Sequence, residues 1–394
     1  FMLTIESIIL FWQPVSHKSN LLLSEKLEII YFVDANHGND EWSGILEEPN
    51  PENTDGPVRT IQKAYANIRF PASTIYVKAG IYRETLNLSK NYPVIIKPRP
   101  GDEGKVIISG ADLVPEDRWQ KCTAEKCAEI DSNPYLSNIY YVDLDFDTTQ
   151  IFQNGMRLPR SRYPKEGYLF PTAVTKDAQK EFVDENLAQP DHYFEESYCH
   201  IRTRNWSINQ LKVEKHADKH IGLMGKTRFD ISKGSGYYFT NIPKFINQPR
   251  QWAFLESTKR LYFYPSGSLQ DIEVSRRDYG ITTDSSISQH IISGLIFRYA
   301  NRNGIQISEA DHILFQGNTI EHPYKIGINI KNSRKINLAS NVIKYANNEG
   351  IRTSKDSSDI TIKGNYIYAT GAENYGDDLI SGVGTAIINY SPGA

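Results

Sequence analysis

The sequence lacks long hydrophobic runs and a strong excess of either charge. No run of eighteen apolar residues occurs anywhere in the chain, so a helical membrane span is not expected. Lys and Arg number 44 and Asp and Glu number 47, which gives a formal net charge of −3. A chain with this balance has no general attraction to nucleic acid. With 394 residues, of which 39% are hydrophobic, it can bury a large core.

Cysteine is also scarce, with three residues in the whole chain. Cys122 and Cys127 lie in the polar stretch KCTAEKC and could close a small disulfide loop in an exported protein, which would leave Cys199 over. Three free thiols are the alternative. A zinc site would need a second pair of ligands at a suitable spacing, and only His200, beside Cys199, comes near that.

The first residues contain a short apolar patch, Ile8 to Trp12, which resembles the hydrophobic region of a signal peptide. A basic segment before it and a clear small-residue cleavage site are both missing. We therefore expect residues 1–27 to be a signal remnant or an N-terminal extension, and the protein to be secreted or periplasmic. Because the chain begins at Phe1 and stops soon after the apolar run Ala386-Ile387-Ile388, we also expect it to be a fragment, truncated at the C-terminus.

A repeat of 23 residues organises the C-terminal part of the chain. Gly304, Gly327 and Gly350 are spaced by 23 residues, and each is followed by Ile. A second column has spacings of 23, 23 and 24 residues and consists of Gly294, Gly317, Ser340 and Gly364. Between these positions, apolar residues alternate with polar ones in runs of about three to five residues, bounded by Gly and Asn. This pattern predicts short β-strands and no helices.

A period in the low twenties with β-branched strands, Gly and Asn fits one coil of a parallel β-helix, in which each coil buries its inward side chains against its neighbours. A leucine-rich repeat would require a recurrent Leu-x-x-Leu-x-Leu frame, which is absent. We predict that one inward column is formed by Ile305, Ile328 and Ile351. We also predict an asparagine ladder at a turn, formed by Asn318, Asn341 and Asn365.

The repeat does not extend through the whole chain. In the stretch DGPVRTIQKAYANI, Asp55 is positioned to cap a helix that begins at Pro57, and such a helix would cover the open end of the first coil. Between about Val114 and Leu269 the period disappears, and Asn154-Gly155 between alternating residues predicts a hairpin. We therefore predict an all-β protein with a capping helix and an inserted antiparallel domain. The expected parts are an N-terminal cap with the first coils at 28–114, the inserted domain at 115–270, and further coils at 271–394.

Several segments carry a resemblance to a known group of proteins. They are TIYVKAGIYRETLNL, VIISGADLV, FQNGMRLPRSRYP, WAFLESTKRLYFYP and GLIFRYANRNGI. Together they resemble secreted bacterial right-handed parallel β-helix proteins of carbohydrate metabolism, a group that contains glycoside hydrolases and polysaccharide lyases. The resemblance covers roughly residues 28–394. It implies an enzyme that acts on a complex polysaccharide in a cleft along one long face, and it does not specify the substrate.

Candidate acids come from positions where the coils depart from the repeat. Successive coils lie about 4.8 Å apart, so acids on neighbouring coils fall within the range that glycosidases use. Alignment places Glu349 in a column with Asn303 and Ile326, just before the repeated Gly. From Gly350 to the matching Gly384 is 34 residues, eleven more than the period, and the surplus contains Glu373, Asp377 and Asp378. We predict that Glu349 with Asp377 or Asp378 forms a catalytic pair. The alternatives are a Ca²⁺ site at Glu373, Asp377 and Asp378, or solvated turn carboxylates.

Further residues in the same or adjoining columns are candidates for substrate binding: His322, Tyr345, Arg352, Lys344 and Tyr299. Alignment places Lys344 in a column with Arg298, Glu321 and Tyr368. The tyrosines could offer ring faces to sugars, or they could pack as surface aromatics, and the histidine could be an ordinary hydrogen-bonding residue. Arg160 and Arg162, in RLPRSRYP, could reach the cleft from the inserted domain.

Three functions remain open at this stage. The leading hypothesis is a glycoside hydrolase that cleaves a plant or algal polysaccharide or oligosaccharide by paired-carboxylate chemistry and requires no cofactor. The second is a polysaccharide lyase in which Ca²⁺ neutralises a uronate while Lys344 or Arg352 takes the C5 proton. The third is a non-catalytic carbohydrate-binding β-helix or adhesin. The products distinguish the first two, because a lyase yields an unsaturated uronide that absorbs in the ultraviolet.

Overall fold

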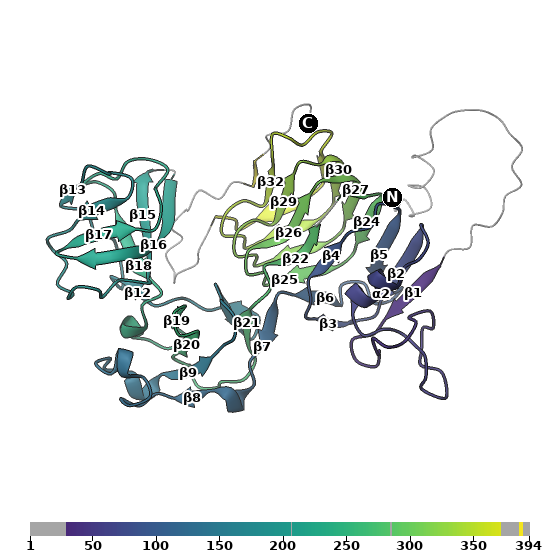
Figure 1. The fold of residues 1–394 in the computed structure, drawn as a ribbon, viewed down its shortest axis with the longest axis horizontal. Coiled ribbons are helices and arrows are strands. Elements are labelled where there is room, and N and C mark those ends of the chain that lie inside the picture. The colour runs from purple at the N-terminus through teal and green to yellow at the C-terminus, as the bar shows by residue number, and fades with distance from the viewer. Residues whose placement is uncertain (1–28, 206, 284–285, 372–385, 389–394) are drawn as a thin grey trace, which may run out of the picture.

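A computed structural model describes residues 29–205, 207–283, 286–371 and 386–388. The chain winds into successive coils, and the strands of these coils form three parallel sheets (Figure 1). We name this part of the molecule the coil stack. Sheet A has eight strands: β1 (Ile30–Val33), β2 (Ser73–Val77), β5 (Val94–Pro98), β24 (His290–Ser293), β27 (Ala310–Gln316), β30 (Arg334–Ala339) and β33 (Thr361–Lys363), with β23 (Ile287–Ser288) beside β27.

The other two sheets have six strands each. Sheet B contains β3 (Gly80–Tyr82), β6 (Val106–Ser109), β25 (Ile296–Arg298), β28 (Thr319–Glu321), β31 (Val342–Lys344) and β34 (Tyr366–Tyr368). Sheet C contains β4 (Leu86–Leu88), β22 (Tyr279–Thr283), β26 (Asn303–Ser308), β29 (Ile328–Lys331), β32 (Ile351–Thr353) and β35 (Ile387–Ile388). The chain passes from sheet A to B to C and back to A, which confirms the predicted parallel β-helix.

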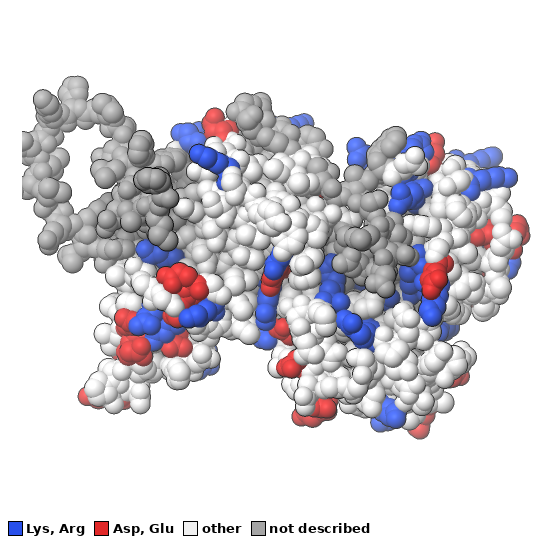
Figure 2. Space-filling model, turned by 180° about the vertical axis from the view of Figure 1, so that it is seen from behind, with Lys and Arg blue, Asp and Glu red and all other residues white. Residues whose placement is uncertain are grey.

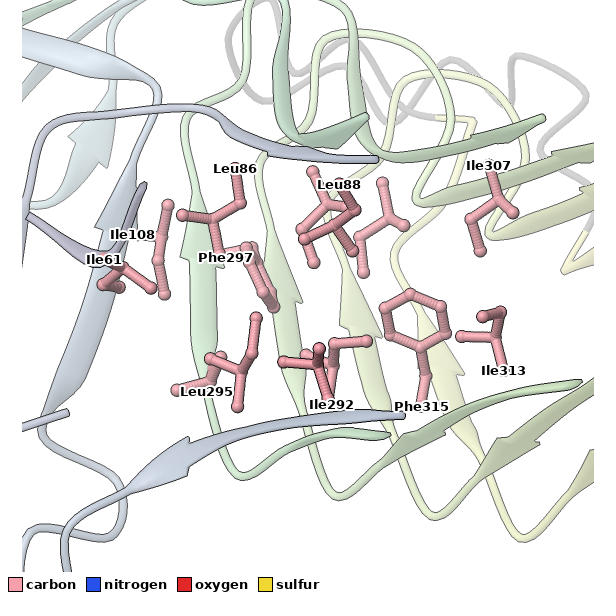
Figure 3. Close-up of a cluster of buried hydrophobic side chains, with 14 of the residues drawn as sticks. Ile61, Leu86, Leu88, Ile108, Ile292, Leu295, Phe297, Ile307, Ile313 and Phe315 are labelled. Carbon is pink, nitrogen blue, oxygen red and sulfur yellow. The ribbon is translucent and has the colours of Figure 1, made fainter. Parts of the chain in front are cut away.

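The repeat observed in the sequence sets the register of the stack. Ile305 pairs with Ile328 and Ile328 with Ile351, and all three side chains are fully buried, as predicted. They belong to one continuous apolar core that fills the interior of the coils (Figure 3). The preceding glycines are required by close packing, because a Cβ on Gly327 would lie 2.4 Å from the carbonyl oxygen of Gly350. No larger residue fits there without moving the next coil.

The asparagine ladder forms as predicted. The side-chain amide of Asn318 donates to Oδ1 of Asn341 at 3.1 Å, and that of Asn341 donates to Oδ1 of Asn365 at 2.9 Å. Each Asn also donates to a main-chain carbonyl oxygen, such as that of Ile292 or Phe315. The ladder therefore connects successive coils through buried hydrogen bonds.

The capping helix is present, but it begins later than predicted. Helix α2 spans Ile61–Asn67, and Thr60 is its N-cap, with the side-chain oxygen accepting from the N–H of Lys63. Asp55 instead accepts hydrogen bonds from the N–H and the hydroxyl of Ser43. The prediction of Asp55 as the cap was wrong because this carboxylate fixes an earlier loop, while Val58 forms a parallel bridge with Val33.

The parallel pattern stops after β6 and resumes at β22, and we name the chain between them the insert. Its strand pairs are antiparallel. One sheet contains β12 (Arg162–Tyr163), β13 (Ala173–Val174), β14 (Glu181–Val183), β15 (Tyr198–Arg204), β16 (Ser207–Ala217), β17 (His220–Leu223) and β18 (Tyr237–Thr240). A second contains β8 (Gln120–Lys121), β9 (Tyr140–Asp143), β19 (Trp252–Leu255) and β20 (Arg260–Phe263). Figure 1 shows the first sheet as a lobe at the left and the second below the stack.

A third antiparallel sheet joins the insert to the stack and contains β7 (Ala111–Leu113), β10 (Ile151–Gln153), β11 (Met156–Arg157) and β21 (Ile272–Ser275). Strands β10 and β11 form the hairpin that Asn154-Gly155 predicts. Four short 3₁₀ turns complete the described helical structure of this region: Glu116–Arg118, Ala128–Ile130, Leu136–Asn138 and Pro243–Phe245. The fold class is thus as predicted. The boundaries proposed for the separate parts stay predictions, and residues 1–27 lie outside the described residues.

The three cysteines form one disulfide and one free thiol. Cys122 and Cys127 form a disulfide, and Cys199 is a buried free thiol, which decides between the two alternatives left by the sequence. In the part of the chain that the structure describes, no helix has the length and apolar character needed to span a bilayer.

Candidate functional site: a cleft between the coil stack and the insert

A cleft of about 1220 Å³ lies between the outer face of sheet C and the insert. The stack contributes residues from strands β22, β26, β29 and β32 and from the turns that precede them, and the insert contributes residues from β15, β16 and β18. Figure 1 shows the lobe of the insert at the left and the strands of sheet C to its right. The volume exceeds the range of roughly 300–1,000 Å³ typical of small-molecule sites, so the cleft has room for an extended ligand.

The floor of the cleft follows the coil repeat. Thr282, Gln306, Asn329 and Arg352 occupy equivalent positions on successive strands and pair in register. Oε1 of Gln306 accepts from the side-chain amides of Asn329 at 2.8 Å and Asn303 at 3.0 Å. Alternation along each strand explains the arrangement, because the neighbouring Ile residues point inward and these polar side chains point outward. The floor therefore presents a row of hydrogen-bonding groups at coil spacing.

Aromatic and polar residues of the insert form the facing wall. His200 and Tyr238 stack with ring centroids 4.5 Å apart, and Nε2 of His200 lies 2.9 Å from the hydroxyl of Thr240. Burial lowers the pKa of His200 well below its usual value, with a further contribution from Arg160 and Arg162. The imidazole is thus neutral, and its role in the wall is packing and hydrogen bonding and not charge.

The wall is attached to the stack by a contact on each of three successive coils, which we name the seam. The hydroxyl of Thr149 donates to Oδ1 of Asn301 at 2.6 Å, and the side-chain amide of Gln210 donates to the hydroxyl of Tyr324 at 2.7 Å. On the next coil, Arg157 donates to Oδ1 of Asn347 at 2.5 Å. Asn301, Tyr324 and Asn347 all stand three residues before the repeated Gly, so one column of the stack positions the insert.

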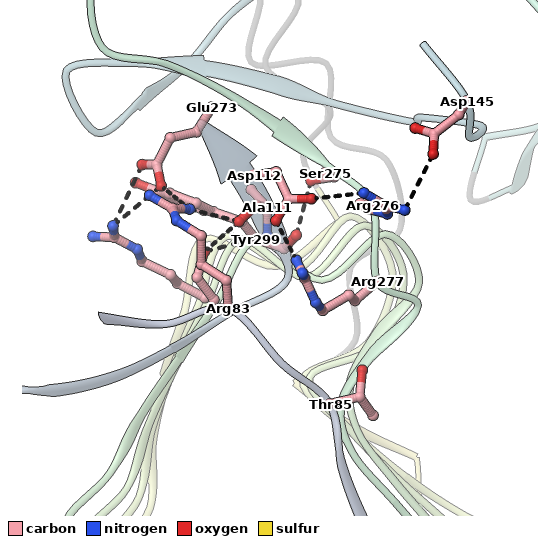
Figure 4. Close-up of polar contacts among 12 residues, drawn as sticks. Arg83, Thr85, Ala111, Asp112, Asp145, Glu273, Ser275, Arg276, Arg277 and Tyr299 are labelled. Atoms are coloured by element: carbon pink, nitrogen blue, oxygen red, sulfur yellow. Dashed lines mark hydrogen bonds and ion pairs between the residues drawn. The ribbon is translucent and has the colours of Figure 1, made fainter. Parts of the chain in front are cut away.

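Ion pairs hold the two ends of the insert where they leave and re-enter the coil stack (Figure 4). Glu273 on β21 pairs with Arg83 at 2.8 Å and with Arg298 at 3.4 Å. Asp112 on β7 pairs with Arg277 at 2.6 Å and with Arg276 at 3.2 Å. Because β7 and β21 also pair as strands, this junction is fixed by both main-chain and side-chain contacts.

Glu349 lies at the edge of the floor and is the most buried carboxylate of the cleft, with 8% of the residue exposed. Its Oε1 accepts a hydrogen bond from the guanidinium of Arg352, three residues further on. Its Oε2 is buried without a hydrogen-bond partner among the described residues. A buried carboxylate oxygen without a partner is costly, which makes a ligand hydroxyl or a water a natural occupant of this position.

The other predicted acids cannot be compared with Glu349. Asp377, Asp378 and Glu373 lie outside the described residues, so the predicted catalytic pair and the alternative Ca²⁺ site stay predictions. Among the residues that the structure does describe, no group of three or more His, Cys, Asp or Glu side chains is arranged to hold a metal ion.

Four of the predicted substrate-binding residues lie elsewhere. Tyr299 is 2% exposed and stacks on Phe152 of the insert with ring centroids 3.7 Å apart, and His322 stacks on Tyr345 at 4.5 Å. These rings form a column under the β10–β11 hairpin and do not line the cleft. Burial lowers the pKa of His322 to about 2 and raises that of Tyr299 to about 12. The expectation of open ring faces for sugars does not fit this column, because the insert covers it.

Lys344 is also outside the cleft lining. Its ammonium pairs with Glu321 at 2.8 Å, and this hydrogen bond raises the pKa of Lys344. A lysine held in its charged form is poorly suited to removing a proton, so this pairing gives no support to Lys344 as the base of a lyase, and that role stays a prediction. The column of Arg298, Glu321 and Lys344 exists as predicted, but it serves ion pairing on sheet B. Arg352 is the predicted binding residue that does line the cleft.

The two arginines expected to reach the cleft are buried behind its wall. Arg160 packs over the rings of Tyr198 and Trp252, and its guanidinium donates to the carbonyl oxygen of Thr149. Arg162 donates to three carbonyl oxygens, including that of Gly167, and lies over the ring of Tyr238. Both guanidinium groups therefore bind carbonyl oxygens and aromatic rings within the insert, and neither lines the cleft.

The sequence analysis did not identify Gln306 and Asn329 of the floor or Gln210 and Arg228 of the wall. The floor residues had a usable signal, since each stands two residues after a repeated Gly in an outward-facing position. The wall residues had none, because they lie in a segment without a period, and Arg228 stands 50 residues before Asp278, the first coil residue that lines the cleft.

Comparison with known proteins identifies the fold. Residues 261–390 match the family model of a right-handed beta helix region. A solved structure named "Glycoside hydrolase" has a TM-score of 0.67 with 12% identity and covers 87% of this chain and 73% of its own. A complex of XylC with xylose has a TM-score of 0.42 with 13% identity and covers 86% of this chain and 62% of its own. No curated protein matches the chain. The matched family model and the first structure show a right-handed parallel β-helix.

Proposed function

We propose that this right-handed β-helix protein is a glycoside hydrolase that cleaves a plant or algal polysaccharide or oligosaccharide in the cleft between sheet C and the insert. One observation carries the proposal: Glu349 is a buried carboxylate at the floor of a large polar cleft, with one oxygen paired to Arg352 and the other without a partner among the described residues. The likeness in fold to a protein named as a glycoside hydrolase supports the same class.

The geometry supports one role for Glu349 in particular. Glycoside cleavage requires one protonated carboxylic acid and one ionised carboxylate on either side of the glycosidic bond. The guanidinium of Arg352 provides a counter-charge for an ionised carboxylate, so Glu349 is suited to act as the nucleophile, or as the base that activates water. Its free oxygen would face the anomeric carbon or that water.

The protonated acid must come from another residue. Asp377 or Asp378, in the eleven-residue surplus of the repeat, is our candidate from the sequence. Asp278 is the other described carboxylate that lines the cleft, and it lies 3.7 Å from Arg302. The floor amides of Gln306 and Asn329 would bind sugar hydroxyls and orient the chain.

The test is a comparison of Glu349→Gln with wild type in the full-length chain, on a panel of plant and algal polysaccharides. We expect turnover, measured as new reducing ends, to fall by about 100-fold to 10,000-fold, which is typical for loss of an acid–base group. The circular dichroism spectrum should not change, because the substitution preserves shape and removes only charge.

Glu321→Gln is the matched control, since Glu321 is also an ion-paired glutamate of the stack but does not line the cleft. It should retain activity within about threefold of wild type, as expected for a partly exposed pair. Equal activity of Glu349→Gln and wild type would contradict the proposed site. Products that absorb in the ultraviolet would show elimination and therefore a lyase, and saturable binding without turnover would show a carbohydrate-binding protein.

A further inference from the structure

The charge of the cleft is opposite to the charge of the chain. The full sequence carries a net charge of −3, whereas the described cleft lining contains five cationic side chains and two carboxylates. In Figure 2, blue side chains are visible in the region between the coil stack and the lobe of the insert. Such a local reversal in a concave surface concentrates anions, because low-dielectric walls focus the field.

Two of the five cations are already neutralised. Arg352 pairs with Glu349, and Arg302 lies 3.7 Å from Asp278. The three that remain are Arg228, Lys325 and Lys331, and none of them forms a salt bridge among the described residues. Asp278 acts on Lys325 at longer range. The positive charge of these three side chains is therefore additional to the ion pairs of the cleft.

These three cations come from separate parts of the molecule. Lys325 precedes strand β29 of the stack and Lys331 is the last residue of that strand, whereas Arg228 belongs to the insert on the facing side. The N–H of Arg228 donates to Oδ1 of Asn209, which itself lines the cleft, so this loop is fixed beside the wall. Partial enclosure of its ammonium lowers the pKa of Lys325, with a smaller contribution from Arg302 that Asp278 opposes, although the residue is exposed at the cleft rim. Enclosure of a cation is unfavourable, and an anion bound beside it would offset that cost.

We infer that the cleft binds a sugar chain that carries anionic groups, either uronate carboxylates or sulfate esters, and that Arg228, Lys325 and Lys331 recognise those groups. This inference rests on the proposed function for the location of the site and adds the substrate class. Hydroxyl groups of the same chain would bind to the amide row of Gln306 and Asn329, while the cations provide the preference for negative charge.

The test measures binding by calorimetry to the full-length chain, so that it does not depend on turnover. The probes are oligogalacturonate, a sulfated galactan oligosaccharide and a neutral cello-oligosaccharide of matched length. We expect at least one anionic probe to bind more tightly than the neutral one, and its affinity to fall as salt is raised. Methyl-esterified oligogalacturonate distinguishes the two sources of charge, because esterification removes the carboxylate and has no bearing on a site for sulfate.

Charge-removal variants assign the effect to named residues. Arg228→Gln, Lys325→Gln and Lys331→Gln should each weaken binding of the anionic probe by about twofold to fivefold, the range expected for partly exposed charge pairs. The triple variant should abolish most of the salt dependence. Lys363→Gln, at an exposed lysine of the stack that does not line the cleft, should bind as wild type does.

The outcomes separate this inference from the proposed function. Tighter binding of the neutral probe, or anionic binding that the triple variant leaves unchanged, would overturn the inference. If a neutral glycan is hydrolysed with dependence on Glu349, the proposed function holds and the inference fails. If an anionic probe binds through the three cations but no polysaccharide is cleaved, the inference holds and the proposed function fails.

Discussion

In the coil stack, a buried side chain packs against the residue at the same position one coil away, whereas in the insert the buried side chains pack in clusters without a repeated partner. Ile328 lies between Ile305 and Ile351, and the neighbouring columns repeat this arrangement. In the insert, Phe194 stacks on Phe239 at 4.0 Å and Phe182 meets Tyr237 edge to face at 4.7 Å. A change in the stack therefore affects a column of equivalent positions, while a change in the insert affects a local cluster of unlike residues.

This difference also divides the cleft. The hydrogen-bonding groups of the floor are spaced one coil apart because they follow the repeat. The residues of the wall come from a segment without a repeat. The candidate site lies where the two regions meet: the column three residues before the repeated Gly forms the seam, and the next two columns line the cleft with Arg302, Lys325 and Glu349. The predictions that follow test how far the two regions differ.

The largest effect is expected from a glycine of the stack. In Gly327→Ala, the new Cβ would lie 2.4 Å from both the Gly350 carbonyl oxygen and Cγ2 of Ile343, so the next coil must move. We expect a loss of about 3 kcal/mol or more in the free energy of unfolding, measured by chemical denaturation. Gly222→Ala in the insert is the control, because its Cβ would meet Lys215 at an ordinary 3.4 Å. Similar losses in both variants would contradict the difference in packing.

The asparagine ladder provides the second test. Asn341→Ala removes the acceptor for the N–H and the side-chain amide of Asn318, both of which are buried. We expect a cost of about 2–3 kcal/mol, since unpaired buried donors remain. Asn365→Ala should cost less because Asn365 is only half-buried. An equal loss of unfolding free energy in both variants would indicate that the stability provided by the ladder does not depend on burial.

A pH effect is expected at the N-terminal end of the stack. Glu84 accepts the N–H groups of Ile61 and Gln62 at the start of α2, and burial raises its pKa to about 7, assisted by Asp40 and opposed by Arg277. Between about pH 4.5 and 7 the folded state therefore holds a proton that the unfolded state releases. The free energy of unfolding should fall as pH rises through this window, on the order of 2 kcal/mol.

Thermal unfolding followed at several pH values would check this expectation. In Glu84→Gln, which cannot titrate, the decline between pH 4.5 and 7 should be reduced by the same amount, although the variant itself is less stable because an amide offers one acceptor oxygen in place of two. An unchanged pH profile in Glu84→Gln would assign the effect to other groups.

The smallest effect is expected at the seam. Thr149→Val removes the hydroxyl that donates to Asn301 and leaves the main-chain N–H bond to the same side chain. We expect about 0.5–1 kcal/mol of lost stability, typical of one hydrogen bond, and weaker glycan binding because the wall is less firmly held. A variant with reduced stability but unchanged binding would show that the cleft does not require the seam.

The sequence predicted the features that depend on local or repeated signals. The inward Ile column, the asparagine ladder and the hairpin at Asn154-Gly155 all follow from spacing or from two adjacent residues. The helix start was misplaced because Asp55 and Thr60 are both acceptable caps, and only the tertiary contact of Asp55 with Ser43 decides between them.

The candidate site was predicted less well, for a physical reason. Glu349 and Arg352 depart from the repeat at positions that face outward, so they can be recognised from the sequence. Whether an outward column is open or covered depends on where the insert packs, and the repeat carries no information about that. Tyr299 and Gln306 are both residues of one coil with polar groups. Phe152 covers Tyr299, whereas Gln306 lines the cleft.

The pairing of β7 with β21 has a consequence for how the chain folds and how it can vary. These strands bring together residues that are separated by the entire insert, as in the partners Asp112 and Val274. The entropy lost on closing such a loop grows only with the logarithm of its length, so doubling the insert would cost about 0.6 kcal/mol more. Coils after β22 form from contacts near in sequence and can assemble early, whereas the junction waits for a distant encounter. The wall of the cleft is therefore exchangeable: a lobe of another size could be grafted between the same two strands without rebuilding the coils beneath it.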